Sequence, residues 1–141
     1  MFGDIGRGAG LFSKRVQGDS AREFSESRAY KEAAKAPGRY PTLLSGVEWW
    51  LPLTTGPSVF SAPRVTGQPT LMGRIDQLVT ELQTLARQLG LTRDEDRERI
   101  RQAGPPSSPD DLHTTGQFGL AVFHSLALTA QRSRQPLVLD Y

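Results

Sequence analysis

The sequence predicts a mainly α protein, a small helical bundle with a coiled-coil-like core, and three segments carry that prediction. Apolar residues recur at alternating spacings of four and three through residues 71–89, which is the pattern of a coiled-coil or bundle seam. Residues 109–131 are apolar around most of a helix circumference, so they are the natural partner of that seam. Residues 92–103 form a charged helix between them. Together they make a helical core over residues 71–131.

The composition fits one domain with a modest core and excludes several kinds of chemistry. The chain has 141 residues, of which 37% are hydrophobic, with 14 glycines and 10 prolines. These values indicate long irregular stretches around a small ordered core. The net charge of +2 is too small to commit the protein to nucleic acid. Because there is no cysteine, disulfides, thiolate nucleophiles and cysteine-ligated metals are excluded.

Residues 1–39 are expected to be a flexible basic arm with one weak helix. Ser20 and Glu23 form a capping box, and Pro37 ends the helix that they start. The excess positive charge of the chain lies in this arm. If the protein binds nucleic acid, these side chains are the expected site. They are Arg7, Lys14, Arg15, Arg22, Arg28, Lys31, Lys35 and Arg39.

Residues 40–70 read as a Pro-rich extended connector with an apolar patch around two adjacent tryptophans. Neighbouring side chains in an extended chain point to opposite sides, so one of Trp49 and Trp50 is expected inside and the other is left for a partner. Residues Tyr40 to Leu43 fit a short tyrosine-proline-x-leucine or tyrosine-x-x-hydrophobic recruitment peptide; the alternative is a turn entering the tryptophan patch. The predicted partner-binding residues are Tyr40, Leu43, Trp49 and Trp50.

The seam of residues 71–89 has a broad apolar face. Its a, d and e positions are all apolar, and its g positions make no charge ladder, which favours a bundle over a two-stranded zipper. Thr70 is the expected N-cap and Gly90 the expected end of the helix. The predicted self-association residues are Leu71, Ile75, Leu78, Leu82, Leu85 and Leu89. Residues 109–131, a second subunit or both are left as candidates to complete the core.

The segments that follow have their own start signals. Thr92 and Glu95 form a second capping box, and Ser108 followed by Pro109 is typical of a helix start. Alternating charges over 92–103 predict a solvated helix held by pairs three or four residues apart. These pairs are Asp94–Arg97, Asp96–Arg99, Glu98–Arg101 and Glu95–Arg99. Residues 132–141 are an extended tail, with a short strand in it or a peptide that needs a pairing partner.

The sequence argues against catalysis and against a bound cofactor or metal. His113 and His124 are the only histidines, and eleven helical residues separate them by about 16 Å, too far to act together. Each is expected to be a surface or core histidine. No phosphate-binding loop, serine nucleophile elbow or zinc-binding helix motif is present. We therefore expect no catalytic, cofactor-binding or metal-binding residue.

Three functional hypotheses follow. The first is a non-enzymatic, self-associating structural or scaffold protein, such as a small viral structural protein, that acts through protein–protein contacts. The second is a nucleic-acid-binding accessory protein that uses the arm of residues 1–39. The third is a membrane-surface or trafficking adaptor that uses the tryptophans. Without a long apolar run or a signal peptide, the chain is expected to be soluble and intracellular, or associated with a virion.

Overall fold

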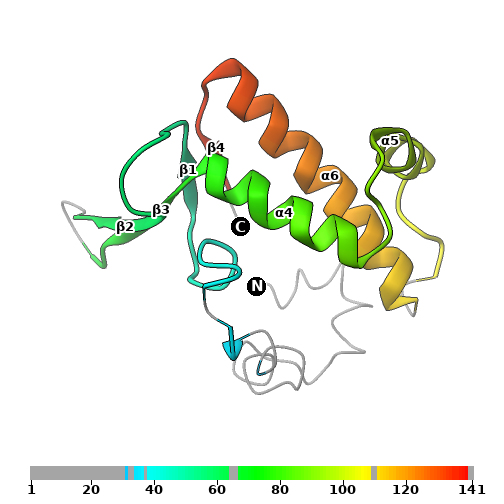
Figure 1. Ribbon diagram of the computed structural model, residues 1–141, viewed down its shortest axis with the longest axis horizontal. Coiled ribbons are helices and arrows are strands. Elements are labelled where there is room, and N and C mark those ends of the chain that lie inside the picture. The colour runs from blue at the N-terminus through cyan, green and yellow to red at the C-terminus, as the bar shows by residue number, and fades with distance from the viewer. Residues whose placement is uncertain (1–30, 32–33, 37, 64–66, 109–110, 140–141) are drawn as a thin grey trace.

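The protein has an α/β fold, so the prediction of a mainly α bundle is wrong. The computed structural model describes residues 31, 34–36, 38–63, 67–108 and 111–139 (Figure 1). A four-stranded mixed sheet lies at one end of the described structure, two helices extend from it, and a third helix lies at their far end. The elements in chain order are β1 (Trp49–Leu51), β2 (Val59–Ala62), β3 (Thr70–Arg74), α4 (Ile75–Gln88), α5 (Asp94–Ala103), α6 (Leu112–Ser133) and β4 (Leu137–Val138).

The sheet is built from the connector and the tail. Its strand order is β2-β3-β1-β4, with β1 parallel to β3 and antiparallel to β4, and β2 antiparallel to β3. The prolines of the connector lie between the strands and not inside them, as their missing N–H requires. The strands have only two to five residues. So short a run shows too little periodicity to be recognised in the sequence.

The predicted helix of residues 71–89 is divided between a strand and a helix. Residues 70–74 form β3, one of the two inner strands, so Leu71 lies in the sheet and Thr70 is not an N-cap. Helix α4 begins directly after it, with Arg74 as the N-cap residue and no side-chain cap bond. The end of the helix is confirmed. Gly90 has φ +73°, and the Leu91 amide donates to the Ala86 carbonyl oxygen at 2.7 Å, as in a Schellman motif.

The apolar face of α4 is buried within one chain. Helices α4 and α6 run antiparallel and side by side, and α5 crosses the end of the pair that is far from the sheet (Figure 1). Trp50 of β1 reaches the same core. Its ring packs edge-on against that of Phe123, with 5.7 Å between the ring centroids. The sheet and α6 therefore complete the core that the sequence left open. The buried core residues are Val47, Trp50, Ile75, Leu78, Val79, Leu82, Ala86, Leu91, Leu120, Ala127 and Ala130.

The starts of the other two helices differ from the prediction. Helix α5 has Arg93 as its N-cap without a side-chain bond, so the expected Thr92 capping box is not formed. Helix α6 is capped by Asp111, whose carboxylate accepts from the Thr114 amide at 3.0 Å, and not by Ser108. Three of the predicted pairs of α5 are confirmed: Asp94–Arg97, Asp96–Arg99 and Glu98–Arg101.

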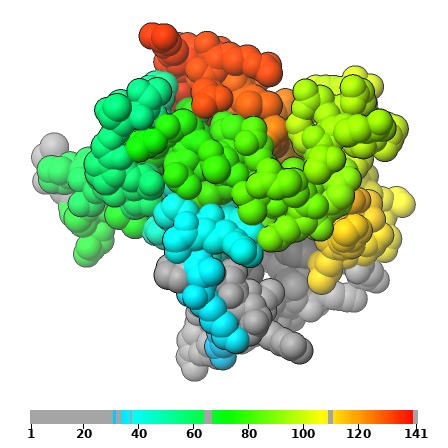
Figure 2. Space-filling view, in the orientation of Figure 1, coloured from blue at the N-terminus to red at the C-terminus, as the bar shows by residue number. Residues whose placement is uncertain are grey.

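A buried carboxylate fixes the turn that leads into β1. Glu81 of α4 is 1% exposed, although its heptad position would place it on the helix surface. Its oxygens accept from the Thr42 amide at 3.0 Å, the Thr42 hydroxyl at 2.9 Å and the Leu43 amide at 3.0 Å. These bonds pair backbone groups that the turn itself leaves free. The start of the connector is therefore an anchored turn that lies against α4 (Figure 2), and it positions the strand that carries the tryptophans.

Candidate functional site

One face of the sheet carries an apolar row that the helices do not cover. Side chains alternate along a strand, and the register places Phe60, Met72, Trp49 and Val138 next to one another across all four strands. We call these four residues the open-face row. Trp49 and Val138 are each 40% exposed, whereas Trp50 on the other face is 2% exposed. The open-face row thus lies on the side of the sheet that faces away from the core.

The surroundings of the open-face row are apolar and electrically neutral. Leu51 lies on the same face, and Leu53 just beyond β1 is also exposed. Arg74 lies opposite Leu51, but its guanidinium is bound to both oxygens of Asp76 at 2.9 and 2.6 Å. This pairing raises the pKa of Arg74 and lowers the pKa of Asp76. A neutral apolar surface of this kind binds by removing its side chains from water and not by attracting charge.

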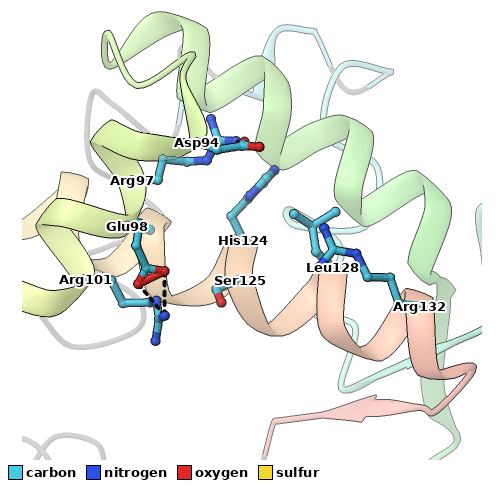
Figure 3. Close-up of a pocket in the computed structure, with 9 residues that line it drawn as sticks. Asp94, Arg97, Glu98, Arg101, His124, Ser125, Leu128 and Arg132 are labelled. Carbon is cyan, nitrogen blue, oxygen red and sulfur yellow. Dashed lines mark hydrogen bonds and ion pairs between the residues drawn. The ribbon is translucent and has the colours of Figure 1, made fainter.

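A second feature lies at the other end of the molecule, between α5 and α6. Charged side chains of α5 and a mixture of polar and apolar side chains of α6 line a pocket of about 190 Å³ (Figure 3). We call it the α5–α6 pocket. Its lining residues are Asp94, Arg97, Glu98, Arg101, Ala121, His124, Ser125, Leu128 and Arg132.

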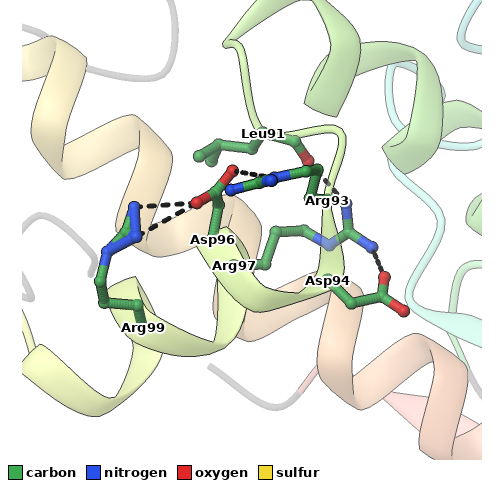
Figure 4. A network of polar contacts seen from close by, with 6 residues as sticks. All are labelled: Leu91, Arg93, Asp94, Asp96, Arg97 and Arg99. Carbon is green, nitrogen blue, oxygen red and sulfur yellow. Dashed lines mark hydrogen bonds and ion pairs between the residues drawn. The ribbon is translucent and has the colours of Figure 1, made fainter.

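The charges of the α5–α6 pocket are only partly paired. Arg97 pairs with Asp94 and donates to the Leu91 carbonyl oxygen at 2.6 Å, which ties α5 to the segment before it (Figure 4). Arg101 pairs with Glu98 at 2.5 Å. Among the contacts of the described chain, none binds the guanidinium of Arg132. The pocket therefore keeps one unpaired positive charge.

His124 is the buried titratable group of this pocket. The residue is 2% exposed, its Nε2 has no hydrogen-bond partner within the described structure, and its ring points from α6 toward Arg97 and Asp94 (Figure 3). Burial lowers the pKa of His124 below its ordinary value of 6.5, and the charge of Arg97 lowers it further, while Asp94 opposes this. The folded protein thus keeps His124 neutral at a pH where the unfolded chain protonates it.

We expect stability to fall on mild acidification because of His124. Below pH 6.5 the unfolded chain binds a proton that the folded chain does not, so the free energy of unfolding decreases as pH falls toward the lowered pKa. Urea unfolding at about pH 7.5 and about pH 5.5 should show a larger loss for the wild type than for His124→Gln. The exposed His113→Gln variant serves as control and should keep the wild-type loss. An equal loss in all three proteins would contradict this role.

The structure separates the residues that the sequence grouped as partner-binding. Trp49 is exposed on the open face, but Trp50 and Tyr40 are buried in the core, at 2% and 7% exposure, and Leu43 is half-buried against it. Residues 40–43 are therefore the turn into the tryptophan patch, and Tyr40 is not displayed as a recruitment peptide. Trp49 alone of this group keeps an exposed surface for a partner.

The other predicted site residues fall into two classes. Of the self-association residues, Ile75, Leu78 and Leu82 are fully buried in the core of one chain; Leu71, Leu85 and Leu89 are half-buried against it. Most of the predicted seam is therefore used within one chain, and a seam between copies stays a prediction. Among the basic residues, Lys31, Lys35 and Arg39 are exposed. The rest lie outside the described residues: Arg7, Lys14, Arg15, Arg22 and Arg28. Nucleic-acid binding stays a prediction.

Sequence reasoning missed most of the open-face row and all of the α5–α6 pocket. Phe60, Met72 and Val138 become neighbours only through the strand register, for which the sequence holds no local signal. The pocket did leave a signal. Residues 94, 97, 98 and 101 recur at the spacing of one helix face, as do residues 121, 125, 128 and 132. The charged spacing of α5 is typical of a solvated face and the apolar content of α6 of a buried helix, so neither pattern by itself predicts a pocket.

Comparison with known proteins supplies no functional information. No protein-family model matches the chain, and no curated protein or solved structure matches it either. No helix of the described chain is both long and apolar enough to cross a membrane. Groups of three or more potential metal ligands are likewise not found among those residues. Function is therefore argued from the two surface features alone.

Proposed function

We propose that the protein is a non-enzymatic structural or scaffold protein whose copies associate through the open-face row. The observation that carries the proposal is the row itself, an apolar surface that spans all four strands and exposes Trp49. Tryptophan and methionine are enriched where proteins bind one another. This moves the expected self-association from the buried seam of α4 to the face of the sheet.

A second copy suits this surface because the row is compatible with twofold symmetry. An axis along the strands lays Met72 of one copy over Trp49 of the other, and Phe60 over Val138. The first contact pairs a thioether with an aromatic ring, which is favourable. The row contains no charge, so two identical copies meet without like-charge repulsion.

The size of the row sets the expected strength of association. Four strands of three residues cover on the order of 19 Å by 10 Å. A stable dimer buries about 800 Å² on each partner, so one such contact is small. We therefore expect a weak, concentration-dependent dimer. Weak contacts of this kind become effective in a scaffold, where many copies are held together.

We predict that Trp49→Glu abolishes this association. The substitution places a carboxylate in the centre of an apolar contact, where it has no partner, and should weaken dimerisation by more than about tenfold. Sedimentation equilibrium over a wide concentration range measures it directly. The wild-type mass should rise with concentration, and the variant should keep the monomer mass. Because Trp49 is exposed, the substitution should leave the fold intact, and the circular dichroism spectrum of the variant should match that of the wild type.

The matched control is Leu126→Glu on α6. Leu126 is 50% exposed and lies on a helix outside the sheet, so this change adds the same charge to another apolar surface position. It should leave association unchanged. A wild type that stays monomeric at all concentrations would refute the proposal, as would equal association by both variants.

A further inference from the structure

The α5–α6 pocket is separate from the proposed self-association surface. Helix α5 lies at the end of the helices that is far from the sheet (Figure 1). Arg97 and Glu98 come from α5, whereas His124, Ser125 and Arg132 come from α6. Neither the fold nor the open-face row requires a polar opening here, so the pocket calls for an explanation of its own.

The charge balance of the pocket favours an anion. Asp94 and Glu98 are both occupied in ion pairs with arginines of their own helix. Each carboxylate is thus neutralised by an arginine, and neither leaves an uncompensated negative charge in the pocket. What remains is the guanidinium of Arg132, which reaches back along α6 toward the pocket beside Leu128 (Figure 3). An unpaired guanidinium at the rim of a small pocket attracts a negative group.

The donors of the pocket suit an oxyanion. A guanidinium presents parallel N–H groups that match two oxygens of a phosphate, and the Ser125 hydroxyl adds a neutral donor. His124 Nε2 is an independent sign of a ligand, because it is fully buried, lines the pocket and has no partner in the described structure. A buried polar atom of this kind is normally hydrogen-bonded. One further ligand oxygen would bind it.

We propose that the α5–α6 pocket binds a phosphate group, either as inorganic phosphate or as a small phosphate monoester. Arg132 holds two phosphate oxygens at the rim, and His124 Nε2 donates to a third from below. Ser125 and the already paired Arg101 lie beside the same opening. The volume of about 190 Å³ is below that of pockets for drug-sized ligands, so the ligand is small.

The test is an NMR titration of the full chain with inorganic phosphate, with chloride at matched ionic strength as reference. Phosphate should give saturable shifts at the His124 ring and at amides of α5 and α6, and chloride should not. Arg132→Gln should weaken phosphate binding by about tenfold or more, because it removes a bidentate, charge-assisted contact. Arg87→Gln, an equally conservative change at an exposed arginine of α4, should bind as the wild type does.

A second titration with glycerol 3-phosphate identifies the source of the phosphate group. Tighter binding than inorganic phosphate assigns the pocket to a monoester, and equal or weaker binding assigns it to the free ion. The proposal is overturned if phosphate produces no saturable shifts, or if Arg132→Gln binds phosphate as well as the Arg87→Gln control. Trp49→Glu is tested by its effect on mass in solution and Arg132→Gln by its effect on phosphate binding. The outcome of one test is therefore independent of the other.

Discussion

Replacing Glu81 with leucine is expected to lower the free energy of unfolding by about 3 kcal/mol. The carboxylate is 1% exposed and accepts from three donors of Thr42 and Leu43. Thr42 itself is fully buried, so water cannot replace these bonds without opening the turn. Leucine fills much of the same volume but leaves the donors unpaired. Urea unfolding followed by circular dichroism measures the difference.

Two further variants separate the hydrogen bonds from other effects of removing a charge. Glu81→Gln keeps the shape and one acceptor oxygen, so it should cost about half as much as Glu81→Leu. Glu95→Leu removes an exposed glutamate of α5 and should change stability by no more than about 0.5 kcal/mol. If Glu81→Leu unfolds at the same urea concentration as Glu95→Leu, the carboxylate does not anchor the turn.

The anchor at Glu81 also bears on the proposed function. The turn that it holds leads through Val47 directly into β1, the strand that presents Trp49 to solvent and Trp50 to the core. A turn that is released from α4 leaves the start of β1 free to move. Variants of Glu81 should therefore weaken self-association in addition to lowering stability, although Glu81 is not part of the open-face row.

The helices were predictable from the sequence because they are long enough to show a period. Helices α4, α5 and α6 have 14, 10 and 22 residues, and each matches a segment of regular apolar or charged spacing, although α6 extends two residues beyond its predicted end at residue 131. The strands were not predictable in this way. Leu71 lies at a heptad position of the seam by coincidence. The heptad pattern therefore predicted a helix for residues that belong to β3. Pairing with β1 on one side and β2 on the other decides their conformation.

The candidate site was predictable only as far as local geometry reaches. Adjacency alone required Trp49 and Trp50 to face opposite sides, and the structure confirms it. Which of them is exposed depends on where the helices pack, and that is set by residues far away in the chain. The same limit applies to His124, whose burial could be expected on an apolar helix, but whose facing arginines belong to another element.

Gly73 of β3 is closely packed by its neighbours, and we predict that any side chain there destabilises the fold. A Cβ atom at this position would lie 3.2 Å from Thr42 Cγ2 and Trp50 Cδ1 and 3.3 Å from Val47 Cγ1. All three neighbours are buried, so none can move aside freely. We expect Gly73→Ala to lower the free energy of unfolding by about 1 kcal/mol and Gly73→Val by about 3 kcal/mol, as overpacking does.

A glycine on α6 gives this prediction its control. Gly119 has open space where a Cβ would be, and it lies inside a helix. Gly119→Ala should therefore raise the free energy of unfolding by about 0.5–1 kcal/mol, since alanine is the better helix former. Chemical denaturation of both alanine variants compares their signs directly. If Gly73→Ala were stabilising, the predicted close contact would be contradicted. The substitution would then act at Gly73 as it does at Gly119, only by reducing the conformational entropy of the unfolded chain. Changes of opposite sign in the free energy of unfolding would instead show that steric crowding is specific to Gly73, where the anchored turn, Trp50 and β3 meet.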